Sequence, residues 1–159
     1  MSGQDRASAG FSFIELIVAT AIMLVLASAA MPLARVSIKR QKEVELHRDL
    51  REVRAAIDAY EDAVTSGQIA GISVSTTGEG YPPDLDTLVE GVVRANSQTG
   101  AKIKFLRKIP IDPMTGKSDW GLRASGDDPK STTWGGTNVY DIYSKSEDKA
   151  LNGSKYKDW

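Results

Sequence analysis

The sequence predicts an α+β fold in which one long N-terminal helix packs on a small antiparallel sheet, with a short second helix and extended loops. Three observations predict it. An uncharged apolar run covers residues 16–34, an amphipathic pattern without glycine or proline covers residues 39–64, and strand patterns occur further along the chain. The chain has 159 residues, enough for one domain and an extended helix.

The apolar run is long enough for a membrane-spanning helix. As a helix, residues 16–34 would measure about 28 Å, close to the roughly 30 Å thickness of a bilayer's hydrocarbon core. Glu15 is the only charged residue of the segment 11–34 and lies at its N-terminal edge. A charge at mid-bilayer costs about 2.5–3.5 kcal/mol, and less near the interface, so a lone acid there is a candidate functional residue.

The segment before the run, residues 1–10, is short, polar and rich in small residues. A secretory signal peptide loses its apolar core on cleavage, whereas a cut between Gly10 and Phe11 would leave the whole apolar run on the mature protein. An uncleaved signal anchor that carries a stray acid is the alternative interpretation.

Gly10, Phe11, Glu15 and the long apolar run together resemble the class III signal of type IV pilins and type II secretion pseudopilins. The resemblance implies that a prepilin peptidase cleaves after Gly10 and methylates Phe11. It also implies that Glu15 pairs with the N-terminal ammonium of a neighbouring subunit during filament assembly. Opposite charges attract strongly in a medium of low dielectric, and each alone is costly to bury there.

Pro32 lies near the end of the apolar run, where this family often has a proline. Proline removes a helical hydrogen bond and clashes with the preceding turn, so it bends or locally melts a helix. The resemblance therefore makes Pro32 a candidate assembly residue. A helix stop at the membrane exit is the alternative.

Basic residues flank the apolar run unevenly, and they argue against the orientation that the resemblance implies. Only Arg6 precedes the run, whereas four basic residues follow it closely: Arg35, Lys39, Arg40 and Lys42. The positive-inside rule would place the following segment in the cytoplasm. The resemblance implies a single-pass protein of the bacterial inner membrane with its head in the periplasm, and we adopt that orientation.

Residues 35–66 are predicted to continue the helix outside the membrane. One apolar seam repeats at spacings of three and four: Leu46, Leu50, Val53, Ile57, Tyr60 and Val64. Charged residues that include Arg48 and Arg54 fill the other faces of this helix. The seam favours packing on the chain's own head over a coiled coil, because the repeat is short. Gly67 is the predicted C-cap.

Residues 67–159 are predicted to form a small α/β head. The expected elements are a flexible loop at 70–80, a helix opened by Tyr81-Pro82-Pro83-Asp84 and extending to about residue 93, a weak strand or a turn at 102–106, a turn at 109–116 and strands at 120–124 and 138–144. Residues 126–136 form a polar loop, and 145–159 are expected to be polar and irregular.

The order of motifs in the head resembles the major pseudopilin of type II secretion. The Tyr-Pro-Pro segment, the Ile-Pro-x-Asp-Pro-x-x-Gly turn at 109–116, Trp120, the Asp-x-Tyr-Ser run at 141–144 and the final Asp-Trp carry this resemblance, with an apparent insertion at 69–80. The resemblance implies a structural subunit of a periplasmic helical filament that helps to move folded proteins through the outer membrane. A type IV pilin of a surface filament, for adhesion, motility or extracellular electron transfer, is the alternative.

The last loop of that family often binds calcium. Asp148 matches the first aspartate of the family's loop, and Glu147 and Asp158 lie near it in the sequence. The family's later paired acids are replaced here by residues 153–157, which include two lysines. Because calcium prefers six to eight oxygen ligands, a calcium site at Asp148 and an ion-free loop both remain open.

Composition narrows the other function classes. The net charge of −1 gives no indication of a nucleic-acid partner, and the absence of cysteine excludes disulfides and thiolate metal sites. His47 has no second histidine at metal-binding spacing and is expected to be solvated or to face another subunit. The sequence also contains no nucleophile–base motif, so we expect a structural protein and not an enzyme. The partners that the resemblance implies are further copies of the chain, minor pseudopilins, the inner-membrane assembly platform, the prepilin peptidase and membrane lipid.

Overall fold

A computed structural model describes residues 12–69 and 80–159, except for the side chains of residues 29–33. The contacts divide the chain into two units, Met1–Lys39 and Arg40–Trp159. The described elements are, in chain order, α1 (Phe13–Thr65), α2 (Leu85–Glu90), β1 (Val92–Val93), β2 (Lys102–Ile103), β3 (Gly121–Arg123), β4 (Asp141–Tyr143) and the 3₁₀ helix η1 (Tyr156–Asp158). This is an α+β architecture with a type IV pilin-like layout, so the predicted fold class is confirmed.

The seam of α1 packs on the chain's own head, as predicted. Its members are almost fully buried, from Leu46 and Val53 at 0% exposure to Tyr60 at 3%, and Val64 packs against the same core. Each buried Leu, Ile or Val side chain contributes about 1.5–3 kcal/mol relative to the exposed state. The seam therefore fixes the head against the second half of α1.

The C-terminus of α1 has the predicted glycine cap. Gly67 has a positive φ of 69°. Its N–H donates to the carbonyl of Val64 at 3.0 Å, and the N–H of Gln68 donates to that of Ala63 at 2.9 Å. This hydrogen-bond pair is the Schellman arrangement, which satisfies carbonyl groups at the helix end.

The second helix is shorter than predicted, because Gly91 ends it. Asp84 caps α2 by accepting the N–H of Thr87 at 2.7 Å. At the other end, Gly91 has a φ of 77°, and a Cβ placed on it would lie 2.5 Å from the carbonyl oxygen of Ile103. The prediction that the helix extends to residue 93 is wrong, since the chain passes through this glycine into β1.

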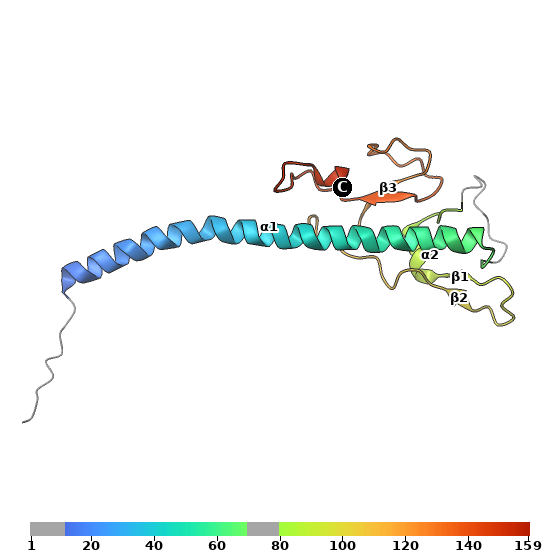
Figure 1. Cartoon of the computed structure of the whole chain (residues 1–159), viewed down its shortest axis with the longest axis horizontal. Coiled ribbons are helices and arrows are strands. Elements are labelled where there is room, and N and C mark those ends of the chain that lie inside the picture. The colour runs from blue at the N-terminus through green and yellow to red at the C-terminus, as the bar shows by residue number, and fades with distance from the viewer. Residues whose placement is uncertain (1–11, 70–79) are drawn as a thin grey trace, which may run out of the picture. The chain divides into compact units, whose positions relative to one another are not determined.

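Two small antiparallel sheets take the place of the single predicted sheet. β1 pairs with β2 with Val92 opposite Ile103, and β3 pairs with β4 with Leu122 opposite Ile142. The strands predicted at 102–106, 120–124 and 138–144 are present with shorter bounds. In Figure 1, α2, β1 and β2 lie along one side of the second half of α1, and β3 lies along the other. The core fills the space against α1 with side chains from both sheets, such as Val92 and Ile142.

Two loops of the head also bear on the predictions. The loop expected at 70–80 lies outside the described residues up to residue 79. In the loop 126–136, the carboxylate of Asp127 accepts the N–H groups of Ala124 at 2.8 Å and Gly135 at 3.0 Å. These two backbone hydrogen bonds hold the pKa of Asp127 below its usual value, and the bond from Ala124 has the larger effect.

Candidate functional site

Of the N-terminal residues with a predicted role, the structure describes Glu15 but not the cleavage site. Gly10 and Phe11 lie outside the described residues. Glu15 is exposed in the first turn of α1, beside Leu16, whose N–H donates to the carbonyl of Ser12 at 3.1 Å. A carboxylate in the first turn interacts favourably with the positive end of the helix dipole.

Large apolar side chains are exposed on every side of the first part of α1. Those of Phe13 and Leu24 are 81% and 72% exposed, and the others are Ile14, Leu16, Ile17, Val18, Ile22, Met23, Val25 and Leu26. An apolar surface of this extent is typical of a segment that inserts into a membrane or packs on partner helices. Within the described residues, no helix meets the length and apolarity needed to cross a membrane.

α1 is continuous through Pro32. The helix extends from Phe13 to Thr65 without interruption, so Pro32 does not end it. The alternative of a helix stop at this proline is therefore wrong, because α1 continues for many residues beyond it. Local melting at Pro32 during assembly remains a prediction.

Arg54 is the centre of the interactions between α1 and the end of the head. Its Nε donates to Asp141 at 2.7 Å, and Nη2 donates to the carbonyls of Ile142 at 3.1 Å and Trp159 at 2.8 Å. Although Arg54 lies on a charged face of α1, only 36% of its side chain is exposed. One guanidinium thus joins α1, β4 and the last residues of the chain.

Arg123 supplies a second guanidinium to the same carboxylate. It donates to Asp141 at 3.1 Å and to the carbonyl of Lys157 at 2.8 Å, and it lies 4.2 Å from the centre of the Tyr143 ring. Its side chain is only 6% exposed. A buried cation needs this many partners, because an unpaired charge in the interior is costly.

The turn predicted at residues 109–116 is held by a buried carboxylate. Asp112 is fully buried, and it accepts the hydroxyl of Ser144 at 2.7 Å and the N–H of Met114 at 2.8 Å. Nearby, the indole N–H of Trp120 donates to the carbonyl of Pro110 at 3.0 Å. The Ile-Pro-x-Asp-Pro turn, Trp120 and the Tyr-Ser end of β4 are therefore joined directly.

The segment 145–159 is mostly irregular, as predicted, apart from an isolated bridge between Lys149 and Lys155 and the short helix η1. It is nevertheless fixed against α1. Glu43 of α1 accepts the N–H of Leu151 at 2.8 Å and the hydroxyl of Tyr156 at 2.9 Å. Burial raises the pKa of the Tyr156 hydroxyl above its usual value, and the hydrogen bond to Glu43 raises it further. His47 is exposed, but its ring stacks on that of Trp159 with centroids 4.1 Å apart.

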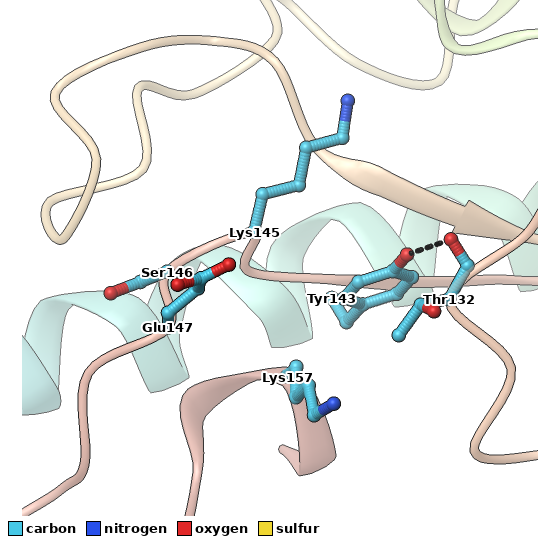
Figure 2. Close-up of a pocket in the computed structure, with 6 residues that line it drawn as sticks. All are labelled: Thr132, Tyr143, Lys145, Ser146, Glu147 and Lys157. Carbon is cyan, nitrogen blue, oxygen red and sulfur yellow. Dashed lines mark hydrogen bonds between the residues drawn. The ribbon is translucent and has the colours of Figure 1, made fainter.

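The residues predicted to bind calcium do not form a ligand set. Asp148, Glu147 and Asp158 are exposed, and no group of three or more His, Asp or Glu side chains suited to a metal ion occurs among the described residues. Glu147 instead lines a pocket of about 320 Å³ with Thr132, Tyr143, Lys145, Ser146 and Lys157 (Figure 2). Lys145 points away from Glu147 and donates to Asp119 at 2.6 Å. The residues present do not fit calcium.

Comparison with known proteins identifies the N-terminal segment. A family profile for the prokaryotic N-terminal methylation motif matches residues 5–31, which include Gly10, Phe11 and Glu15. This motif indicates a prepilin-type protein of the type IV pilin-like superfamily with a membrane-anchored N-terminus. No curated protein and no solved structure gives a significant match to the chain.

The sequence motifs did not indicate the side chains that tie the head together. Arg54, Arg123, Glu43 and His47 belong to no motif. A usable signal was present for Arg54: it lies four residues after Leu50 and three before Ile57, so it borders the buried seam on the helix surface. The partner of each was not predictable, because the chain segments that they join are far apart in the sequence.

Proposed function

We propose that the chain is the major subunit of a type II secretion pseudopilus, a helical filament in the periplasm that helps to move folded proteins through the outer membrane. The chain would assemble with further copies of itself and with minor pseudopilins on an inner-membrane platform, after a prepilin peptidase has acted at Gly10–Phe11. Its role would be structural and not catalytic.

The hydrogen bond between Asp112 and Ser144 is the observation that carries the proposal most strongly. The motifs that resemble the major pseudopilin are separate in the sequence, yet they meet in the head. The Tyr-Pro-Pro segment also contacts this part of the head, because the carbonyl of Pro82 accepts the N–H of Val139 at 2.8 Å. Contact among these motifs in one packed unit favours a common origin with the pseudopilin motifs over chance matches.

The exposed apolar part of α1 supports the filament half of the proposal. Its large side chains are 48–81% exposed. Burying them against lipid or neighbouring helices would contribute about 25 cal/mol per Å² of apolar surface. Glu15 would place a negative charge in this apolar surface, and the ammonium of a neighbouring subunit's Phe11 would neutralise that charge.

Deletion of the gene in the host bacterium tests whether the filament is a secretion pseudopilus or a surface pilus. We expect type II secretion substrates to accumulate in the periplasm, while surface filaments and surface motility remain. Complementation with the wild-type chain should restore secretion. Loss of surface filaments with intact secretion would contradict the pseudopilus and favour a type IV pilin.

A further inference from the structure

Three backbone carbonyl groups of the last segment already accept hydrogen bonds from the protein. The carbonyl of Lys157 accepts from Arg123 at 2.8 Å, and that of Trp159 accepts from Arg54 at 2.8 Å. The carbonyl of Ser154 accepts the N–H of Ala150 at 2.8 Å. Calcium needs six to eight oxygen ligands, and here two guanidinium groups supply positive charge to the oxygens instead.

Glu43 fixes the same segment from the side of α1. One carboxylate oxygen, Oε1, accepts both the Leu151 N–H and the Tyr156 hydroxyl. Leu151 lies within the turn that the antiparallel bridge between Lys149 and Lys155 closes, and Tyr156 directly follows that turn. Because hydrogen bonds to a charged group are about twice as strong as neutral ones, this oxygen anchors the turn at two points.

Trp159 completes the contacts through its ring. The ring stacks on His47 at an interplanar angle of 8°, meets Tyr156 edge-on with centroids 5.0 Å apart, and donates its N–H to the hydroxyl of Ser154 at 2.7 Å. Aromatic pairs of this kind contribute beyond their buried area. The ring thus links α1, the turn and η1.

We infer that four side chains hold residues 149–159 in place without a metal ion: Glu43, His47 and Arg54 of α1, and Arg123 of β3. We call these four side chains the clasp. The head then folds independently of calcium, although its sequence motifs resemble those of a family whose last loop often binds the ion. The inference concerns the folding of the head, and it holds for a pseudopilus and for a surface pilus alike.

Calcium titration of the full mature chain in detergent micelles tests the independence from metal. We expect the melting temperature to stay within about 1 °C between EGTA and about 10 mM CaCl₂, a concentration above the roughly 10⁻⁴–10⁻³ M dissociation constants of weak extracellular sites. A saturable rise of about 4 °C or more would overturn the inference, because ligands that bind only the native state stabilise it.

Hydrogen exchange of the same protein tests the clasp itself. We expect Glu43→Ala to speed exchange of the Leu151 amide about tenfold or more, since that amide loses a charged acceptor. Glu45→Ala is the matched control: Glu45 lies on the same helix, and its carboxylate lies 3.8 Å from the exposed Arg48 guanidinium. Equal exchange of Leu151 in the two variants would overturn the clasp.

A second pair of variants covers the case in which Glu43→Ala does not fold. We expect His47→Ala to expose Trp159 and shift its fluorescence to longer wavelength, whereas His47→Phe retains a stacking ring and the wild-type spectrum. Identical spectra for His47→Ala and the wild type would contradict a role for this stack.

Discussion

Replacement of Glu15 by leucine is expected to abolish filament assembly while the protein is still cleaved, methylated and retained in the membrane. Glu15 is the only charged residue of the segment 11–34. Without it, the ammonium of a neighbouring subunit would lie unpaired in apolar surroundings. An unpaired charge there costs about 2.5 kcal/mol or more. The equilibrium constant for adding one subunit to the filament would therefore fall roughly a hundred-fold.

Electron microscopy of filaments sheared from overexpressing cells measures this effect, together with immunoblots of the membrane fraction. Thr20→Val is a suitable control, because it removes a polar group from the same helix without removing a charge. The Thr20 hydroxyl donates only to the carbonyl of Ile17, at 2.9 Å. Filaments of normal number and length in Glu15→Leu would show that the pairing is not required.

Asp112→Ala should cause the largest loss of stability in the head, about 3 kcal/mol in the free energy of unfolding. The substitution leaves the Ser144 hydroxyl and the Met114 N–H without their acceptor. Each unsatisfied buried donor costs about 1–3 kcal/mol. The loss should also release the turn 109–116 from the end of β4, since the Asp112–Ser144 bond joins them at 2.7 Å.

Urea unfolding of the full chain in detergent, followed by tryptophan fluorescence, would measure the change. Asp119→Ala is the control, because Asp119 is exposed and its ion pair with Lys145 is of the surface type. We expect that control to lose about 1 kcal/mol or less. An equal loss in both variants would mean that the buried carboxylate does not hold the turn.

The parts of the fold that depend on local patterns were predictable from the sequence. The spacing of Leu46, Leu50 and Ile57 identified the buried face of α1, because helical periodicity is carried by neighbouring residues. Gly67 marked the end of that helix correctly. Gly91 carried the same kind of signal, and reading it as a C-cap would have ended α2 before the two valines of β1.

The interactions that unite the head were not predictable, because they join distant segments. Arg54 lies 87 positions from Asp141 and 105 positions from Trp159, so no local pattern relates them. The sequence placed Arg54 on a charged face of the helix, and the structure pairs it with a carboxylate and two carbonyls. His47 likewise has no sequence feature that indicates stacking on Trp159.

If the chain is a prepilin whose mature form begins at Phe11, the mass of its N-terminal peptide will show it. Membrane protein from the host bacterium would be digested and analysed by mass spectrometry. We expect a peptide that starts at Phe11 and carries a methyl group on its α-amino nitrogen. A peptide that still starts at Met1 would contradict both the pseudopilus and the pilus interpretations.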